Sequence, residues 1–356
     1  MSEARTRAFA LRDSFVDAGA QVVDPPVLQS ADLLLDLYGE DIRARAYVTS
    51  DAMRGEQMLR PDFTVPVVRM HMAHGADPAR YTYAGEVFRR QEDDPDRASE
   101  YLQVGYEVFD GSDPAAADAE VFSLIFQTVA PLGLRAATGD IGILMAAVEG
   151  LKTTERRKAA LRRHIWRPRR FRALLDRFGG RTAIPESRAK LLAGEVGTDA
   201  PLTGLRSQSE IDARLAALVE DAAQPPISGA EMECLDALLA VRETLPFALS
   251  HLHDLSIDLP AIKVAVGRVD ARAEALSARG VDIDRLEFEA SYGRTLMEYY
   301  DGFVFGFYAE SRPDLPPVAT GGRYDALTRR LGKGVEIPAV GAVLRPDLMT
   351  LLEGAS

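Results

Sequence analysis

The stretch that decides the fold is residues 81–109, which read YTYAGEVF (81–88), RRQEDDPDRASE (89–100) and YLQVGYEVF (101–109). The two outer blocks are rich in aromatic and β-branched residues, which are enriched in β-strands. The block between them is charged and predicts a long hairpin loop. The stretch therefore predicts two antiparallel strands joined by an extended loop.

Helix and strand patterns continue on both sides of this pair. Residues 20–27 read as a strand interrupted by Pro25-Pro26. Because proline has no amide donor, this strand is expected at a sheet edge or an interface. The other expected elements before residue 150 are helices at 3–18, 28–37 and 113–130 and strands at 46–50, 57–60 and 135–143.

The pattern becomes helical from about residue 151, and strand patterns return after residue 286. Runs of strands with helices segregated beside them are typical of α+β proteins. We therefore predict an α+β fold with an antiparallel sheet flanked by helices. Residues 1–150 and 285–356 are expected to form this core, and residues 151–284 a mainly helical insertion.

The composition is typical of a globular protein, since 47% of the 356 residues are hydrophobic and 27% are charged. No stretch of 18 uncharged apolar residues occurs, so neither a transmembrane helix nor a membrane partner is expected. The N-terminal residues lack the apolar region of a signal peptide. Cys234 stands alone, which excludes an internal disulfide and a cysteine-based zinc site. These features predict a cytoplasmic protein.

The net charge of −12 is unevenly distributed along the chain. Residues 152–181 hold twelve Lys and Arg against two acids, Glu155 and Asp176, a balance of +10. Three interpretations stay open for this basic segment: a pair of solvated helices, a docking surface for an acidic partner, or a nucleic-acid surface. Few aromatic residues are interleaved for base stacking and the chain as a whole is acidic, so we expect no nucleic-acid partner.

Several common metal and cofactor motifs are missing. Neither His71 with His74 nor His251 with His253 has further ligands at zinc-site spacing, so no metal is expected. No dinucleotide-binding GxGxxG, no P-loop and no GxSxG nucleophile motif occurs. The sequence therefore gives no support to a Rossmann site, a P-loop NTPase or an α/β-hydrolase.

Polar residues interrupt segments that otherwise read as buried strands. Asp62 and Thr64 lie two apart in LRPDFTVP (59–66), and alternate residues of an extended segment share a face. Arg89 follows the strand 81–88.

The same pattern recurs on the second strand and near the C-terminus. Gln103 and Glu107 lie four apart and share one strand face, while Tyr299 and Tyr300 stand in EYYDGFVF (298–305). Unpaired polar groups on a buried sheet face cost a few kcal/mol each, so we interpret the combined set as a ligand site. A structural polar network and an exposed sheet face remain open alternatives.

These blocks together resemble the catalytic core of the histidyl-tRNA synthetases. The resemblance rests on LRPDFTVP, YTYAGEVFRRQ, YLQVGYEVF, YYDGFVF, GGRYDAL and PAVG, and covers about residues 5–150 and 285–350. Pro26 in VDPPVL resembles the dimer-forming first motif of that family, and residues 80–109 resemble its second motif. The resemblance implies a class II aminoacyl-tRNA synthetase fold and self-association as a dimer through the first-motif region.

The departures from the synthetase pattern concern positive charge. The ATP-binding arginine of the third motif falls on Leu348, a second-motif loop arginine falls on Ser99, and the arginine expected shortly before Tyr299 falls on Thr295, beside Arg294. No room is expected for an anticodon-binding domain. Activation of an amino acid with ATP needs cations, and tRNA binding needs a basic surface, so both are expected to be weakened.

The chain is therefore more similar to the regulatory subunits of ATP phosphoribosyltransferase, which are synthetase-like proteins without an anticodon-binding domain. The resemblance implies a subunit without catalytic residues or a cofactor. It implies that the subunit binds L-histidine and acts in the first step of histidine biosynthesis, where it activates a short-form catalytic subunit and mediates feedback inhibition.

The resemblance also implies how histidine is held at its two charged groups. Asp62, a glutamate in the synthetases, is expected to bind the α-ammonium together with Thr64 and Gln103, since a free ammonium needs acceptors. Arg89 and, by a one-residue shift, Arg294 are expected to meet the α-carboxylate.

The imidazole is expected to make two hydrogen bonds. Glu107 accepts from one ring nitrogen, and a hydroxyl of Tyr299 or Tyr300 pairs with the other. An analogue without these nitrogens would leave buried groups unpaired, which favours histidine over other amino acids. The loop ATGGRYDA (319–326) is expected to close near the ligand.

Three other functions fit parts of the sequence. The first is a synthetase paralogue that activates an amino acid with ATP and transfers it to an acceptor. The second is a short aminoacylating enzyme, and the third is a sensor of another ligand that regulates another partner. Histidine-dependent ATP–pyrophosphate exchange separates the first two from the regulatory hypothesis, and ligand screening separates the third.

Overall fold

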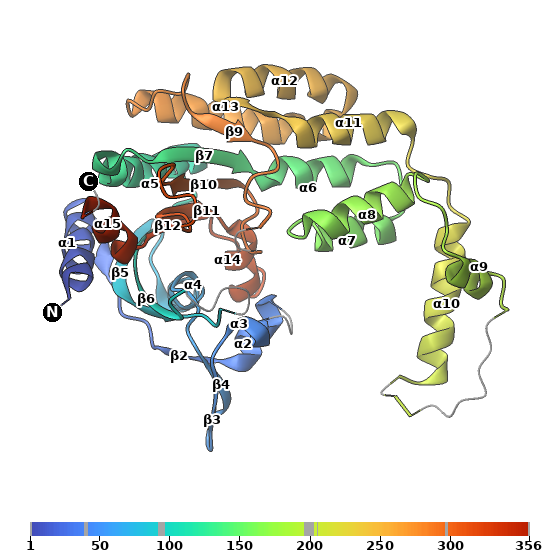
Figure 1. Ribbon diagram of the computed structural model, residues 1–356, viewed down its shortest axis with the longest axis horizontal. Coiled ribbons are helices and arrows are strands. Elements are labelled where there is room, and N and C mark those ends of the chain that lie inside the picture. The colour runs from blue at the N-terminus through green and yellow to red at the C-terminus, as the bar shows by residue number, and fades with distance from the viewer. Residues whose placement is uncertain are drawn as a thin grey trace.

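The computed structural model describes residues 2–38, 42–91, 97–195, 203–204, 206–295 and 298–354 (Figure 1). A large mixed sheet lies at the centre of the fold and helices flank it, which confirms the predicted α+β class. Within the described residues its strands are, in spatial order, β1 (Gln21–Val22), β5 (Ala79–Phe88), β6 (Glu100–Phe109), β12 (Ala339–Leu344), β11 (Ala319–Arg323), β10 (Phe303–Tyr308), β7 (Arg135–Asp140), β9 (Glu287–Glu289) and β8 (Arg242–Thr244).

Most neighbours in this sheet are antiparallel; β1–β5 and β7–β9 are the parallel pairs among the described strands. The predicted strand pair is present as β5 and β6, in register from Ala79 opposite Phe109 to Phe88 opposite Glu100. β12 pairs with β6, so the PAVG block lies directly beside YLQVGYEVF. The sheet thus assembles blocks that are more than 200 residues apart in the sequence.

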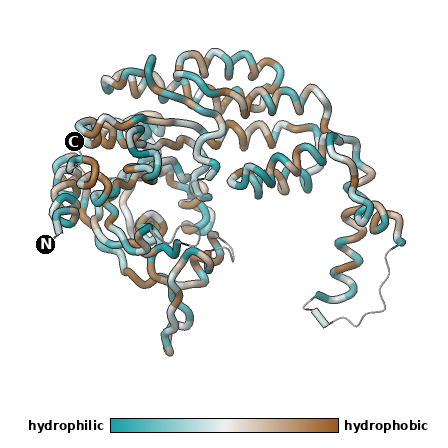
Figure 2. The backbone as a smooth tube through the Cα atoms, in the orientation of Figure 1, coloured by the Kyte–Doolittle hydropathy of each residue, from teal (hydrophilic) through white to brown (hydrophobic). Residues whose placement is uncertain are grey.

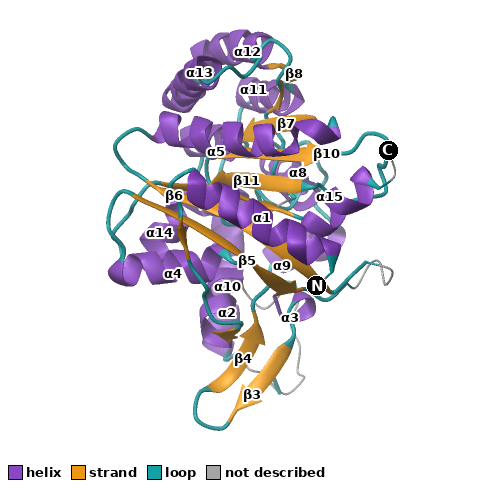
Figure 3. Ribbon diagram, turned by 90° about the vertical axis from the view of Figure 1, so that its left-hand side faces the viewer, coloured by secondary structure: helices purple, strands orange, loops and turns teal. Residues whose placement is uncertain are grey.

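Helices cover one face of the sheet in two layers. α1 (Glu3–Asp17) and α15 (Pro346–Glu353) pack on β6, and α5 (Pro114–Val129) packs on β11 and β12 (Figure 3). The ring of Phe122 on α5 contacts Phe303, Phe305 and Phe307 of β10, with centroids 5.1–6.0 Å apart. α13 (Lys263–Ala278) then packs on α5 as an outer layer.

The opposite face of the sheet carries the polar residues. Successive side chains of a strand point to opposite faces. Tyr106 contacts Phe15 of α1, with ring centroids 5.5 Å apart, so Gln103 and Glu107 point away from α1. α4 (Thr64–His74) and α14 (Asp325–Leu331) pack against each other on this second side.

A small sheet and its helices project from this core near the N-terminal third. The strands of this sheet are, in spatial order, β2 (Leu28–Ser30), β4 (Gly55–Leu59) and β3 (Val48–Asp51). Its helices are α2 (Ala31–Tyr38) and α3 (Ile42–Arg45). The predicted helix 28–37 therefore begins three residues late, because Leu28–Ser30 pair with β4. The predicted strand 135–143 ends at Asp140, whose carboxylate accepts from the Gly142 amide and caps α6 (Ile141–Gly150).

The segment 151–284 is mostly helical. Its remaining helices are α7 (Glu155–Arg163), α8 (Pro168–Phe178), α9 (Glu186–Leu192), α10 (Gln208–Ala222), α11 (Gly229–Ala240) and α12 (Leu245–Asp258). It is joined to the sheet at two places, since β8 pairs with β9 and α13 packs on α5. In the described part of the chain no helix is long and apolar enough to cross a membrane.

Candidate ligand-binding site

A cavity of about 380 Å³ lies on the polar side of the sheet. Its wall comes from the segment before α4, the ends of β5 and β6, the turn into β11, and Thr295, Tyr299 and Tyr300. The lining includes six of the eight predicted site residues: Asp62, Thr64, Arg89, Gln103, Tyr299 and Tyr300. The structure therefore brings together side chains that are up to 238 positions apart.

Asp62 and Thr64 reach the cavity by a different route from the predicted one. β4 ends at Leu59, and Thr64 is the first residue of α4, so the segment is not an extended strand. Asp62 Oδ1 accepts from the Val65 amide at 3.2 Å and thereby satisfies one donor of the first helical turn. Both side chains are buried, and the helix start, rather than strand alternation, directs them to the same cavity.

Gln103 presents an unpaired acceptor to the cavity. Its side chain is only 3% exposed, and Oε1 forms no hydrogen bond with any described residue. A buried acceptor without a donor costs about 1–3 kcal/mol. A ligand that brings an N–H donor would remove this cost, and the carboxylate of Asp62 in the same lining favours a donor that is positively charged.

Arginines supply positive charge to the cavity lining. Arg89 Nε donates to the Pro61 carbonyl at 2.7 Å, which fixes its guanidinium at the end of β5. Arg45, Arg97 and Arg345 also line the cavity. The Arg345 guanidinium lies 4.1 Å from the centroid of the Tyr101 ring. The lining thus holds the carboxylate of Asp62 together with four arginines, groups that suit a ligand with an ammonium and an acidic group.

Glu107 does not line this cavity but lies deeper, and its carboxylate is hydrogen-bonded on both oxygens. Thr64 and Tyr83 donate their hydroxyls to Oε1 at 2.9 and 2.8 Å, and Tyr324 donates to Oε2 at 2.6 Å. Glu107 is 1% exposed. Both oxygens of Glu107 thus already accept from hydroxyls of the protein, those of Thr64, Tyr83 and Tyr324. An imidazole would have to compete with these donors to form the predicted hydrogen bond.

Two glycines make room for this cluster. Tyr83 stands opposite Gly105, where an added Cβ would lie 2.1 Å from the phenol carbon Cζ. Glu107 stands opposite Gly341, where an added Cβ would lie 1.5 Å from Oε2. The glycines of LQVGYE and PAVG therefore let the two polar side chains cross the sheet surface.

Burial changes the acid–base properties of the cluster. It raises the pKa of Glu107 to about 7, although the hydroxyls of Tyr324, Tyr83 and Thr64 favour the ionised form and oppose the rise. Burial and the charge of Glu107 raise the pKa of Tyr83 well above its usual value. The raised pKa favours the protonated tyrosine, which is the form that donates to Glu107.

The tyrosine pair lies at the edge of the cluster. The ring centroids of Tyr299 and Tyr300 lie 5.0 Å apart, and that of Tyr299 lies 6.1 Å from Tyr324. Tyr300 is buried, and this burial, with the charges of Glu107 and Asp62, raises its pKa. Both tyrosines line the cavity, so either hydroxyl is placed to meet a polar ligand group.

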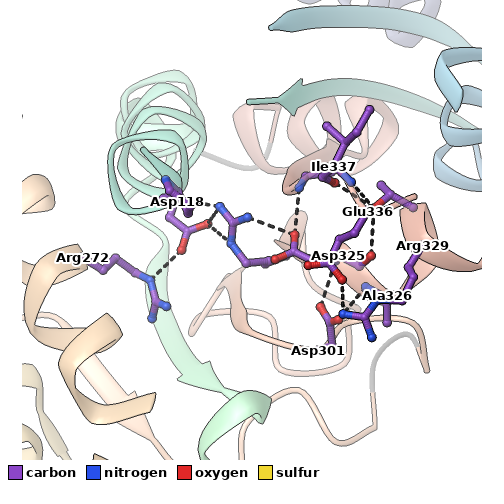
Figure 4. Close-up of polar contacts among 12 residues, drawn as sticks. Asp118, Arg272, Asp301, Asp325, Ala326, Arg329, Glu336 and Ile337 are labelled. Carbon is purple, nitrogen blue, oxygen red and sulfur yellow. Dashed lines mark hydrogen bonds and ion pairs between the residues drawn. The ribbon is translucent and has the colours of Figure 1, made fainter. Parts of the chain in front are cut away.

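The GGRYDA turn that carries Tyr324 is fixed by a buried charge network (Figure 4). Asp118 on α5 pairs with Arg323 at 2.7 Å and with Arg272 on α13 at 2.9 Å. Arg323 also pairs with Asp325 at 3.0 Å. The residues on both sides of Tyr324 are thereby held, which sets the position of its hydroxyl against Glu107.

Asp301 completes this network beside the tyrosine pair. Its carboxylate accepts from the amides of Asp325 and Ala326 at 3.0 and 2.6 Å, at the start of α14 (Figure 4). Burial and the charge of Asp325 raise the pKa of Asp301 to about 7. The sequence analysis did not select this aspartate, although it directly follows Tyr300.

Arg294 is placed outside the cavity lining. Its Nε donates to the Ile165 carbonyl at 2.8 Å, and its guanidinium lies 4.7 Å from the Phe171 ring centroid. Burial and the charge of Arg172 lower the pKa of Arg294 to about 10. The next residue, Thr295, does line the cavity. Arg294 would have to leave its present contacts to reach a ligand carboxylate.

Sequence reasoning missed two groups of site residues. Tyr83 and Tyr324 belong to motif blocks but were given no role, although hydroxyls adjacent to a buried acid are a visible signal. Arg345 compensates in part for the loss of arginine at Leu348: it lines the cavity, whereas Leu348 is buried and apolar in α15. No side-chain cluster among the described residues could hold a metal ion.

Comparison with known proteins identifies the class of the fold. The model of the family described as histidyl-tRNA synthetase matches residues 2–224 and 207–349. A solved structure of an ATP phosphoribosyltransferase regulatory subunit/histidyl-tRNA synthetase from Bacillus halodurans superimposes with a TM-score of 0.69 at 20% identity, over 98% of this chain and 79% of that one. The histidyl-tRNA synthetase from Nostoc sp. PCC 7120 gives 0.63 at 16% identity, over 99% and 71%. The fold is that of a histidyl-tRNA synthetase-like protein of class II.

The sequence relatives define the family more narrowly. The ATP phosphoribosyltransferase regulatory subunits of Brucella ovis and Brucella abortus are each 32% identical to this chain over 97% of its length and 96% of their own. The chain belongs to the ATP phosphoribosyltransferase regulatory subunit family.

Proposed function

We propose that this chain binds L-histidine in the cavity and regulates a separate, short-form catalytic subunit of ATP phosphoribosyltransferase. The observation that carries the proposal is the unpaired, buried Oε1 of Gln103 beside Asp62 in the cavity lining. An α-ammonium would satisfy this acceptor, and Arg89, which also lines the cavity, would meet the α-carboxylate. Tyr299 and Tyr300 would contact the imidazole.

The regulatory role follows from the family and from the arrangement of the cavity. The relatives are named as regulatory subunits, so the catalytic site is proposed to reside on the partner chain and this chain to need no cofactor. The first step of histidine biosynthesis, in the cytoplasm, is the proposed setting. Feedback inhibition requires that histidine binds one assembly state better than another, since equal affinities would shift nothing.

Self-association is proposed to use the first-motif region. Apolar side chains are exposed there on neighbouring strands and loops: Val22, Val27, Leu28, Tyr47 and Val48. β2 and β3 flank β4 on its two sides, so Leu28 and Val48 belong to one small sheet. Contiguous exposed apolar side chains are typical of an interface, which supports a dimer.

Calorimetric titration tests the ligand. The wild-type chain should bind L-histidine with an affinity in the micromolar range or weaker, on the order of 6–8 kcal/mol. Asp62→Asn should weaken binding strongly, whereas Asp51→Asn, in the exposed β3–β4 hairpin, should leave it unchanged. Equal histidine affinity in wild type and Asp62→Asn would show that the ligand is held elsewhere.

One observation favours a second candidate, a paralogue that activates an amino acid with ATP and passes it to an acceptor. Four guanidinium groups line the cavity. One of them belongs to Arg345, three residues before Leu348, the position on which the third-motif arginine falls. Cations of this kind offset the charge of ATP phosphates. Histidine-dependent ATP–pyrophosphate exchange that falls in Arg345→Met would support this candidate, and exchange no higher than background would exclude it.

A further inference from the structure

Basic side chains gather on the hairpin of α7 and α8, which is hydrophilic along much of its length in Figure 2. Several of them are already neutralised. Arg157 Nε donates to Asp221 at 2.7 Å, and Arg172 and Arg181 both pair with Asp236. These pairs lie on the sides of α7 and α8 that face the helices α10 and α11, so they explain part of the basic segment as internal structure.

The arginines next to the turn between α7 and α8 are different. Arg163, Arg169 and Arg170 are exposed, and none of them forms an ion pair with another described residue. Burial lowers the pKa of His164, and the charges of Arg167, Arg170 and Arg163 lower it further. Several guanidinium groups thus surround one short turn, residues 163–170, which we call the basic turn. Like charges this close repel, and an anionic partner would relieve the repulsion.

Buried polar atoms of the basic turn also lack partners. His164 Nδ1 and Trp166 Nε1 are buried and make no hydrogen bond with any described residue. Most buried polar atoms in folded proteins are paired. The unpaired state of these two nitrogen atoms makes the basic turn costly as it stands, and the exposed arginines are the groups of this turn that a partner can reach.

The basic turn is also in contact with the segment that lines the ligand cavity. Arg294 Nε donates to the Ile165 carbonyl at 2.8 Å, and Glu298 pairs with Arg167 at 3.7 Å. Arg294 Nη2 is buried and has no partner among the described residues. Thr295, between these two contacts, lines the cavity. A ligand that displaces this segment would therefore disturb the basic turn.

We propose that the basic turn is the surface on which an acidic face of the catalytic subunit docks, and that Arg294, Thr295 and Glu298 link its occupancy to the ligand cavity. This inference rests on the proposed function, because it requires the catalytic subunit as the partner. Carboxylates of the partner would pair with Arg163, Arg169 and Arg170. Because coupling between two sites is reciprocal, docking would change histidine affinity by the same factor as histidine changes docking.

Charge reversal at the basic turn tests the docking surface. The variant Arg163→Glu with Arg169→Glu and Arg170→Glu is compared with wild type and with a matched control that reverses three exposed arginines elsewhere, which also form no ion pair with a described residue: Arg206, Arg214 and Arg330. Each chain is titrated with the short-form catalytic subunit at low and at high salt, and with L-histidine alone. Sizing chromatography of each chain without the catalytic subunit measures self-association.

The expected result is an affinity for the catalytic subunit about 100-fold lower in the turn variant and within about threefold of wild type in the control, because like charges across an interface are strongly unfavourable. The wild-type affinity should fall as salt rises. Histidine binding by the turn variant alone should equal that of wild type, which shows that the variant is folded.

Three results would overturn the inference. Wild-type affinity in the turn variant removes this surface from the interface and leaves the proposed function standing. Loss of self-association instead of partner binding makes a second copy of this chain the occupant. Failure of the wild-type chain to bind the catalytic subunit at all removes both the inference and the proposed function.

The link through Arg294 and Glu298 has its own readout. The factor by which saturating histidine changes the affinity for the catalytic subunit is measured in wild type and in two variants, Arg294→Met and Glu298→Gln. The factor should fall towards one in both variants, since each removes one contact with the basic turn. An unchanged factor in both would contradict the link.

Discussion

Replacement of Glu107 by Gln should flatten the dependence of stability on pH. Burial holds the pKa of Glu107 at about 7 in the folded chain, against 4.5 for an ordinary glutamate. One unit of pKa corresponds to about 1.4 kcal/mol, so this group alone is worth about 3 kcal/mol of pH-dependent stability.

The sign follows from proton linkage. The folded chain binds the proton of Glu107 more tightly than the unfolded chain does. The resulting stabilisation is fully present below pH 4.5 and is lost as the pH rises through about 7. Wild type should therefore lose about 3 kcal/mol relative to Glu107→Gln between pH 4.5 and pH 8.

Urea unfolding followed by fluorescence of Trp166 is the assay, at pH 5, 6, 7 and 8. Asp301, whose pKa is also raised to about 7, titrates in the same range but is present in both proteins, so its contribution cancels in the difference. Asp301→Asn is the matched control and should remove a similar part of the pH dependence. If the free energy of unfolding of wild type and of Glu107→Gln changes with pH by the same amount, the raised pKa of this carboxyl group is refuted.

Three further substitutions test the site and its support. Gln103→Leu removes the unpaired acceptor and should weaken histidine binding by about 1–3 kcal/mol in calorimetry, whereas unchanged affinity would exclude Gln103 from the site. Gly341→Ala places a Cβ 1.5 Å from a Glu107 oxygen and should lower the free energy of unfolding by about 1–3 kcal/mol, while Gly229→Ala, with open space around it, should not. Asp118→Asn removes the carboxylate that two buried arginines share; because Arg272 keeps Asp140 and Arg323 keeps Asp325, it should cost about 1–3 kcal/mol in the same unfolding assay, and an unchanged free energy of unfolding would mean that the network is not structural.

The main sheet could be read from the sequence because its signals are local. Aromatic and β-branched residues marked β5 and β6, and strand alternation placed Gln103 and Glu107 on one face, as the structure has them. The same rule failed at Asp62 and Thr64, where a capping aspartate starts α4. Pro66 near the start of a helical pattern was the available signal for that helix.

The contacts within the site could not be read from the sequence, because they join distant segments. Tyr324 reaches Glu107 across 217 positions, and Glu107 gains its three hydroxyl donors only when α4, β5 and the turn after β11 are assembled around it. The position of Arg345 in the cavity depends on how β12 ends, which no local pattern indicates. Arg294 was expected near the ligand from its place in a motif, and its contact with Ile165 comes from the helical segment packing against that motif.

The most direct test of the regulatory account is the transferase rate of the short-form catalytic subunit, measured with and without this chain over a titration of L-histidine. The account predicts that the chain raises the rate, that histidine lowers it again, and that Asp62→Asn raises the concentration of histidine needed. A rate that the chain does not change, or an enhanced rate that histidine does not inhibit, would contradict it.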